Sequence, residues 1–170
     1  MPYEFDPDAL REARQDIESR ISGQDVDLDV EEAVSNIYRA ATVLSRTAEK
    51  EIMSVEDLSW SGFSVLWVLW VWGEMDSSRL AAELGLTLGT VTGVRKGLEA
   101  NGLAACRTDP DDGRRRLISL TSEGEQVIER TYPRFNRWAA ELLGGLSADE
   151  VQLLAKLLRT VIVAPAERTG

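Results

Sequence analysis

The residues that could contact a nucleic acid are concentrated in one segment of a chain that is acidic overall. The 170 residues include 19 Lys and Arg against 29 Asp and Glu, a formal net charge of −10. Residues 77–121 are the exception, with 7 basic and 5 acidic residues. Because Lys and Arg bind phosphates and the acceptor edge of guanine, this segment suits DNA better than the rest of the chain. A charge excess this small is also common on solvated surfaces.

The chain lacks most of the residues that build catalytic and metal centres. It has no histidine and one cysteine, Cys106, so zinc-type sites and the usual pairs of nucleophile and base lack their components. No P-loop and no G-x-G-x-x-G phosphate cradle occurs. We therefore expect no enzyme activity, no metal and no cofactor. Cys106 is interpreted as a structural thiol, with oxidation sensing as the alternative.

Two helices separated by a tight turn are predicted in the basic segment. The first begins at Asp76 or Ser77, whose side-chain oxygens suit an N-cap, and ends at Gly85. Thr87 caps a second, longer helix that runs to Asn101 and has apolar residues at helical spacing for a buried face. This order of elements is typical of a helix-turn-helix.

A charged β-hairpin follows the second helix. Residues 109–113 are turn formers and residues 117–120 are rich in strand formers, so two short strands are expected to flank a tip. The tip carries three consecutive arginines, Arg114, Arg115 and Arg116. The predicted fold class is therefore mainly α with a small β-wing, a winged helix-turn-helix.

Four phrases of this segment, LAAELGLT, TVTGV, GLEANGL and DPDDGRRRLISLTSEG, resemble the core signature of the MarR family of transcription regulators. The resemblance extends more weakly into the helix-rich flanks. It implies a dimer in which flanking helices of two subunits interlock. The expected organisation is an N-terminal extension helix and acidic linker at 1–28, a MarR-type domain at 29–163 with a DNA-binding lobe at 59–121 and dimerisation helices at 29–53 and 122–163, and a tail at 164–170.

The resemblance implies a DNA-binding transcriptional regulator, specifically a ligand-responsive repressor that binds a palindromic promoter site as a homodimer. Two recognition helices related by a twofold axis would read half-sites about one helical turn of double-stranded DNA apart. The alternative is a winged-helix protein-interaction module or antirepressor that does not read DNA. No apolar run is long enough for a bilayer and no signal peptide is evident, so a cytoplasmic location without a membrane partner is expected.

The second helix is the predicted recognition helix. On a helical wheel, Thr92 and Lys96 face outward and could reach base edges or phosphates, while Leu88 could touch a thymine methyl group. Arg95 lies on the flank of this face. The candidate DNA-binding residues in the helix-turn-helix are Ser77, Thr87, Leu88, Gly89, Thr90, Thr92, Arg95 and Lys96.

Glycines at 89, 93 and 97 recur every four residues along this helix. Each costs about 1 kcal/mol of helix propensity relative to alanine, so an offsetting benefit is expected. One explanation is that bare backbone lets the helix lie deep in the major groove. The other is close packing against a neighbouring helix.

The wing supplies the remaining candidate DNA contacts, Arg107, Arg114, Arg115 and Arg116. The family resemblance implies that Asp112 and Arg114 brace the hairpin tip. Arg115 or Arg116 could then enter the minor groove. A role confined to the solvated surface is the alternative for all three arginines of the tip.

The family resemblance also implies a pocket for a small aromatic or anionic effector between the dimer helices and the DNA-binding lobe. Four rings of the helix predicted at 59–72 lie within about 80° on a wheel of about 100° per residue. Core packing is the competing interpretation, because this helix is apolar almost all round. The candidate pocket residues are Trp60, Phe63, Trp67 and Trp70, with Tyr38 and Arg39 as a hydroxyl and a cation for a carboxylate ligand.

Two capping patterns predict the starts of the C-terminal helices. Ser122 with Glu125 and Ser147 with Glu150 have the spacing of capping boxes. Pro133 is expected to kink or interrupt the first of these helices, because proline lacks the backbone N–H that a helix interior needs. The last helix is predicted over residues 151–163.

Overall fold

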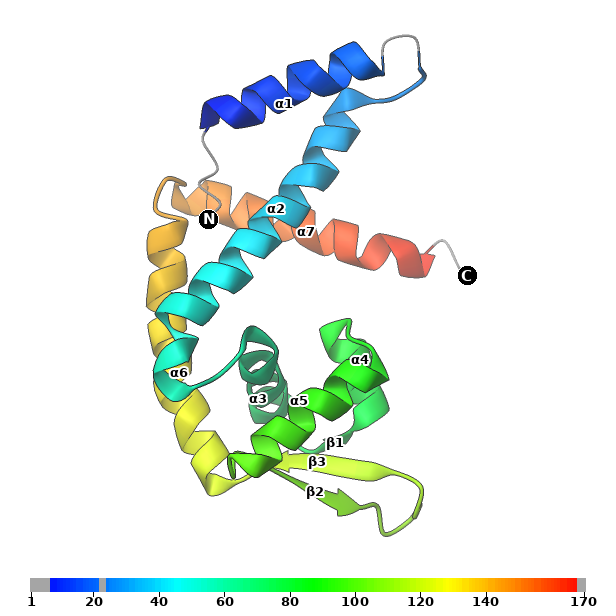
Figure 1. The fold of residues 1–170 in the computed structure, drawn as a ribbon, viewed down its shortest axis with the longest axis vertical. Helices are drawn as coiled ribbons and strands as arrows, with labels where there is room; N and C mark the ends of the chain where they lie inside the picture. Colours follow the sequence, from blue (N-terminus) through cyan, green and yellow to red (C-terminus); the bar gives the residue numbers. More distant parts are fainter. Residues whose placement is uncertain (1–6, 22–23, 168–170) are drawn as a thin grey trace. The chain divides into compact units, whose positions relative to one another are not determined.

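The computed structural model describes residues 7–21 and 24–167, and these residues are mostly helical (Figure 1). The chain divides into two compact units, residues 1–47 and 48–170, with the division inside α2. None of the described helices is long and apolar enough to span a membrane. The elements in chain order are α1 (Pro7–Arg20), α2 (Leu28–Glu51), a 3-10 helix η1 (Met53–Glu56), α3 (Trp60–Trp72), β1 (Met75–Asp76), α4 (Ser77–Leu84), α5 (Leu88–Ala100), β2 (Ala104–Thr108), β3 (Arg116–Leu120), α6 (Ser122–Leu142) and α7 (Ala148–Glu167).

The first unit joins α1 to the N-terminal part of α2 through ion pairs. Arg14 of α1 donates to Asp29 at 2.8 Å and also pairs with Glu32. The Asp27 side chain accepts hydrogen bonds from the backbone N–H groups of Asp29 and Val30 at 3.0 and 3.2 Å. Asp27 thereby satisfies N–H groups that the start of α2 would otherwise leave unpaired.

Helix α3 is the centre of the second unit. The Ser59 side chain accepts a hydrogen bond from the Gly62 N–H and caps the helix, and Phe63 and Leu66 are buried within it. A helix that is apolar all round is stable only when it is covered, and α3 packs against α4, α5 and α6. The hydrophobic core consists of Ala48, Met53, Leu58, Phe63, Val65, Leu66, Val68, Leu69, Met75, Leu80, Ala81, Val91, Leu98, Leu103, Ala104, Ile118, Val127 and Ile128.

The wing belongs to a three-stranded antiparallel sheet of order β1-β3-β2. Ile118 of the central strand β3 faces Met75 of β1 and Cys106 of β2, and it is fully buried. The two-residue strand β1 was not predicted, because so short a strand has no periodicity of its own. The sheet therefore ties the wing to the segment that enters the helix-turn-helix.

The predicted start of α6 was wrong by one residue. Thr121, not Ser122, caps the helix: its side-chain oxygen accepts from the Gly124 N–H at 3.0 Å and donates to the Gly102 carbonyl at 2.6 Å. The second bond reaches a residue far back in the sequence, so a local pattern could not reveal it. Close packing fixes Gly124, because a Cβ there would lie 2.0 Å from the Leu103 carbonyl oxygen.

The other expectations for the C-terminal helices are met in part. Ser147 and Glu150 form the predicted capping box, with the Ser147 N–H donating to the Glu150 carboxylate at 2.8 Å and the Glu150 N–H donating to the Ser147 hydroxyl at 3.4 Å. Pro133 lies inside α6 without interrupting it, since the helix continues to Leu142. Helix α7 extends beyond the predicted residues 151–163 at both ends.

Candidate nucleic-acid interface

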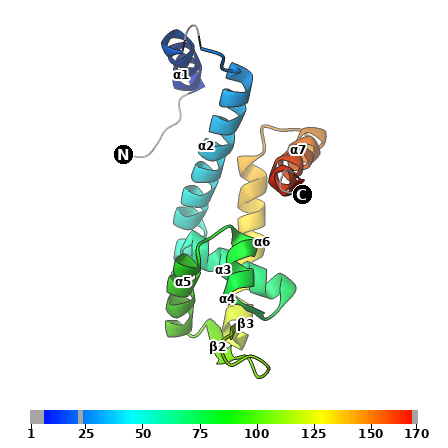
Figure 2. The ribbon, with the colours of Figure 1, turned by 90° about the vertical axis from the view of Figure 1, so that its right-hand side faces the viewer.

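Helix α4 begins and ends where the sequence predicts. The Asp76 carboxylate accepts hydrogen bonds from the backbone N–H groups of Ser78 and Arg79, both at 2.9 Å, and so caps the helix. Gly85 ends it with φ +62°, in the left-handed region that glycine adopts without strain. Figure 2 shows α4 and α5 above the hairpin of β2 and β3.

Helix α5 buries one face and exposes the other. Its N-cap is Thr87, whose hydroxyl oxygen accepts from the Thr90 N–H at 3.1 Å. Val91 and Leu98 are buried in the core, whereas Leu88 is 53% exposed. These positions confirm the predicted inward face and leave the side with Leu88 open to a ligand.

The polar side chains of α5 differ in whether they already form ion pairs or hydrogen bonds within the chain. The Arg95 guanidinium pairs with Glu99 one turn later and is only 18% exposed. The Thr92 hydroxyl donates to the Leu88 carbonyl at 2.8 Å, so its remaining capacity is that of an acceptor. Lys96 is exposed and forms no ion pair with any of the described residues. Lys96 is therefore the cation of this helix that is available to an anionic ligand.

The glycines of α5 are open. Apart from the backbone of α5 itself and the adjoining residues, no described atom lies within 4 Å of a Cβ placed at Gly93 or Gly97. At Gly89 the nearest atom is the hydroxyl oxygen of Thr87, at 3.7 Å. Close packing against a neighbouring helix therefore does not explain these glycines within the described chain. Their backbone forms a bare strip on the exposed side of the helix.

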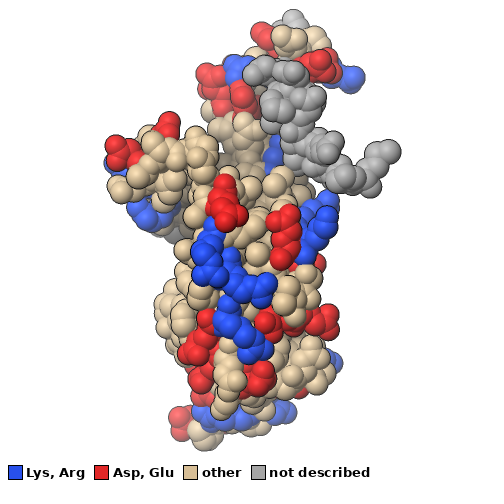
Figure 3. Space-filling view, turned by 90° about the vertical axis from the view of Figure 1, so that its left-hand side faces the viewer, with Lys and Arg blue, Asp and Glu red and all other residues tan. Residues whose placement is uncertain are grey.

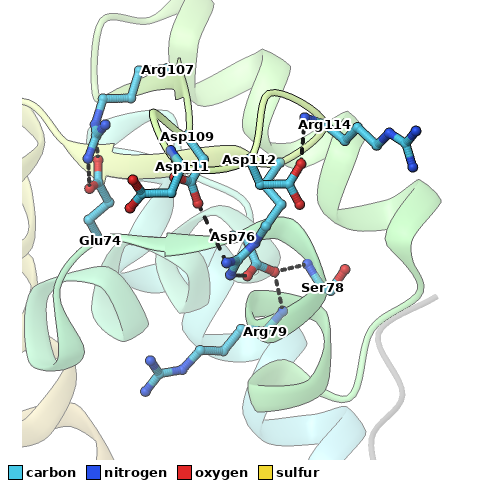
Figure 4. A network of polar contacts seen from close by, with 10 residues as sticks. Glu74, Asp76, Ser78, Arg79, Arg107, Asp109, Asp111, Asp112 and Arg114 are labelled. Atoms are coloured by element: carbon cyan, nitrogen blue, oxygen red, sulfur yellow. Dashed lines mark hydrogen bonds and ion pairs between the residues drawn. The ribbon is translucent and has the colours of Figure 1, made fainter.

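Two arginines of the wing are held by carboxylates that precede α4 (Figure 4). Arg107 of β2 donates two hydrogen bonds to Glu74, the longer at 2.8 Å. Arg115 pairs with Asp76 and lies 3.5 Å from the Asp109 carboxylate. Both cations are about half exposed but are paired with carboxylates of the same chain, which separates them from side chains that are free to meet an external anion.

The two residues predicted to brace the hairpin tip, Asp112 and Arg114, are in contact through the backbone of Arg114. The Asp112 carboxylate accepts a hydrogen bond from the backbone N–H of Arg114 at 3.0 Å, and the Arg114 side chain points away from the polar network in Figure 4. Asp112 thus braces the turn through the backbone, while the arginine that braces the wing with its side chain is Arg115. Sequence spacing missed this because Asp76 lies far from Arg115 along the chain.

The remaining arginine of the predicted tip, Arg116, lies at the start of β3. Its guanidinium donates to the Thr108 hydroxyl at 2.8 Å, across the β2–β3 pair. A hydroxyl partner does not cancel the charge. Arg114 and Arg116 are therefore the wing cations without a carboxylate partner among the described residues.

The contact between Asp76 and Arg115 also shifts the pKa values of both groups. The pKa of Asp76 is held below its usual value, chiefly by the hydrogen bond from Arg115 and then by the N–H of Arg79, while burial acts in the opposite direction. The same contact with Asp76 raises the pKa of Arg115. Both groups therefore stay charged at neutral pH, and the ion pair persists there.

Basic side chains also occur away from the winged lobe. Figure 3 shows Lys and Arg side chains along the middle of one face, with Asp and Glu side chains beside them. In the second unit, Arg130 of α6 is compensated, since it donates to Glu56 at 2.8 Å and to Glu123 at 3.5 Å. Arg130 lowers the pKa of Glu56 through the hydrogen bond between them. The Arg130–Glu56 pair therefore links α6 to η1.

The rings proposed for an effector pocket fall into three separate groups of aromatic contacts. Trp60 and Phe63 pack with Phe135 of α6, at centroid distances of 5.9 and 5.2 Å. Core packing accounts for these two side chains. The other two rings of the predicted set contact elsewhere: Trp67 with Trp72 at 5.3 Å, and Trp70 with Tyr132 at 5.7 Å.

The remaining two predicted pocket residues lie in the first unit, on α2. Tyr38 is 75% exposed, and the Arg39 guanidinium donates to the Asn36 side chain at 3.4 Å. Neither side chain is buried in the hydrophobic core.

Cys106 lies on β2 and is partly buried, and its interpretation as a structural thiol stays a prediction.

The geometry defines a class of protein. A helix-turn-helix whose second helix has an exposed face, followed by a β-hairpin, is a winged helix-turn-helix. The sequence model of the MarR family matches residues 58–115. The HTH-type transcriptional regulator YwaE of Bacillus subtilis (strain 168) is 36% identical over 155 residues, covering 89% of this chain and 91% of that protein. The chain belongs to the MarR family of DNA-binding transcriptional regulators.

Solved structures agree with this assignment. PcaV of Streptomyces coelicolor, determined in complex with its natural ligand, is 29% identical and has a TM-score of 0.68, covering 82% of this chain and 97% of that chain. BpsR of Bordetella bronchiseptica, whose DNA binding is regulated by 6-hydroxynicotinic acid, is 25% identical with a TM-score of 0.67, covering 78% of this chain and 98% of that chain. Both similarities extend over most of each chain.

Proposed function

We propose that this regulator represses transcription by binding a palindromic promoter site as a homodimer. The observation that carries the proposal is the exposed face of α5, where Lys96 stands beside open backbone at Gly93 and Gly97. A helix with such a face can approach the floor of the major groove closely, and lysine is a common partner of guanine O6 and N7. Arg114 and Arg116 of the wing, which have no carboxylate partner among the described residues, are proposed to add phosphate or minor-groove contacts.

The proposed contact set follows from which groups are exposed and uncommitted. Leu88 is exposed at the first turn of α5 and suits a thymine methyl group. The side chains of Arg95, Arg107 and Arg115 are engaged by acids of the same chain, so we assign them supporting roles. The proposed direct contacts are Ser77, Thr87, Leu88, Gly89, Thr90, Thr92, Lys96, Arg114 and Arg116.

A homodimer is supported by apolar side chains that each unit leaves exposed. In the second unit, α7 exposes Leu157 and Val161, one turn apart, at 55% and 54%. In the first unit, α2 exposes Val30 and Val34, also one turn apart, at 58% and 62%. Apolar stripes of this kind on a soluble chain mark surfaces that another chain covers. A twofold dimer would place two α5 helices on half-sites about 10 base pairs apart.

Responsiveness to a small aromatic or anionic effector is the second part of the proposal. It is supported by the relatives, because PcaV was solved with its natural ligand and 6-hydroxynicotinic acid regulates DNA binding by BpsR. An effector would release DNA by favouring a geometry that does not bind it; a 100-fold difference in affinity shifts the balance by about 2.7 kcal/mol. Titration with a panel of aromatic acids, followed by tryptophan fluorescence and by release of bound duplex, tests this part.

Selection of duplexes from a random pool tests the DNA-binding proposal. We expect a palindrome with half-sites one helical turn apart, and sedimentation of the complex at the mass of two chains on one duplex. An enriched site without twofold symmetry, or a complex with one chain per duplex, would contradict the homodimer. No enrichment of any sequence would favour a winged-helix module that binds protein instead.

A further inference from the structure

We propose that Arg115 is a positioning residue that fixes the wing to the helix-turn-helix, and that Asp76 withholds it from DNA phosphates. The second half of this inference rests on the proposed function, because it takes DNA as the ligand. It assigns different roles to neighbouring arginines that the sequence presents as equivalent. Arg114 is the arginine that would contact DNA, and Arg115 is the one that stays in an ion pair within the protein.

The Asp76 carboxylate links two parts of the lobe. One oxygen, Oδ1, accepts from the backbone N–H groups of Ser78 and Arg79 at the start of α4. The other oxygen, Oδ2, accepts from the Arg115 guanidinium. The Asp76 side chain is 16% exposed and the Arg115 side chain 52% exposed, so the carboxylate side of this pair is shielded from solvent better than that of an ordinary surface ion pair. Movement of the wing would therefore break a contact of the residue that caps α4.

Asp109 holds Arg115 from the other side of the hairpin. Its backbone N–H donates to the Arg115 carbonyl at 3.1 Å. Its carboxylate accepts from the Asp111 N–H at 2.9 Å and lies 3.5 Å from the Arg115 guanidinium, with only 9% of the side chain exposed. A shielded carboxylate needs a compensating cation, because an unpaired charge is costly when water is excluded. If the Arg115 side chain turned to a phosphate, both Asp76 and Asp109 would lose their compensating cation.

A second bridge reinforces the same connection. Glu74 and Asp76 are two residues apart, the spacing that places side chains on one side of an extended segment. Glu74 accepts from Arg107 of β2, and Asp76 accepts from Arg115, the residue that precedes β3. The wing is thus attached at two points to the segment that leads into α4. Arg114 has no such attachment, and its side chain points outward in Figure 4.

Three variants separate positioning from phosphate contact. Asp76→Asn removes the charge but retains the cap, because asparagine is as good an N-cap as aspartate. Arg115→Gln removes the cation of the pair. Arg114→Gln removes a cation from the adjacent position and is the matched control. None of the three changes the apolar core, so all are expected to fold.

The first measurement is backbone amide hydrogen exchange in the free protein. We expect Asp76→Asn and Arg115→Gln each to accelerate exchange of the Asp109 N–H, and the double variant to exchange no faster than either single variant. Arg114→Gln should leave this exchange rate unchanged. Unchanged exchange in Asp76→Asn, or additive acceleration in the double variant, would overturn the positioning role. This result does not depend on DNA.

The second measurement is the salt dependence of duplex affinity. A lost phosphate contact lowers the slope of log K against log salt by about 0.9. We expect that reduction for Arg114→Gln, and a weaker affinity with an unchanged slope for Arg115→Gln. An equal reduction for both variants would overturn the claim that Asp76 withholds Arg115 from phosphates. Absence of duplex binding by the unmodified protein would instead overturn the proposed function, and the exchange result would still decide the positioning role.

Discussion

The recognition helix α5 and the wing are the two parts of the proposed DNA surface, and they differ in how their charge is arranged. On α5 the exposed face consists largely of open backbone with Lys96 as its available cation. In the wing, Arg107 and Arg115 are each paired with carboxylates, and Arg114 extends freely. The number of basic residues in this surface therefore does not give the number of proposed DNA contacts. An arginine or lysine paired with a carboxylate of the same chain stabilises the fold, whereas one without such a partner is available to bind the ligand.

The largest expected effect tests how firmly the wing is built into the core. Ile118 of β3 is fully buried, and replacing a buried isoleucine with alanine costs about 2–5 kcal/mol. We expect Ile118→Ala to lower the free energy of unfolding in urea by that amount. The control is Leu88→Ala on the exposed face of α5, where a change of about 0.5 kcal/mol or less is expected. Equal losses for the two variants would mean that the wing and the α5 face are not anchored differently.

The next effect concerns the available cation of α5. Because Lys96 is exposed without an acidic partner among the described residues, its charge should act on DNA and not on the fold. We expect Lys96→Ala to weaken binding to the selected duplex by about 1–3 kcal/mol with unfolding unchanged. Lys156→Ala on α7 is the matched control and should leave affinity unchanged. The assignment fails if Lys96→Ala binds the duplex like the unmodified protein.

A smaller effect tests the bare strip on α5. A Cβ at Gly93 would meet no described atom within 4 Å, and alanine is favoured over glycine in a helix by about 1 kcal/mol. Gly93→Ala should therefore raise the free energy of unfolding by up to that amount while weakening duplex affinity through added bulk in the groove. Thermal unfolding and fluorescence titration measure the two quantities. Weaker affinity with lower stability would indicate an internal packing role instead.

The smallest effect is the pH dependence from Asp76 in the wing attachment. Its pKa is lowered in the folded state, so its carboxylate stabilises the fold at neutral pH. That contribution begins to be lost as the pH falls below about 4, the usual range of an aspartate, and disappears below the folded-state pKa. Urea unfolding at pH 7 and pH 3 should show a smaller loss of stability in Asp76→Asn than in the unmodified protein. Equal losses in the two proteins would show that the bridge is not coupled to stability.

Local patterns predicted the helix-turn-helix well because its boundaries are set by neighbouring residues. Thr87 and Gly85 act on backbone groups within a few positions, so their types and places suffice. The roles of the tip arginines could not be predicted in the same way. The role of Arg115 depends on its contact with Asp76, and only the pairing of β1 with β3 brings these two residues together. The cap of α6 was misplaced for a related reason, since Thr121 is held by a distant carbonyl as well.

Specific recognition of DNA by this protein can be measured by fluorescence titration of the selected duplex and a scrambled duplex at two salt concentrations. We expect the protein to bind the selected palindrome at least about a thousandfold more tightly than the scrambled duplex, with affinity that falls steeply as salt rises. Such a result would show specific recognition by a surface that combines α5 with the wing. Equal, weak affinity for both duplexes, or no binding to either, would contradict the account.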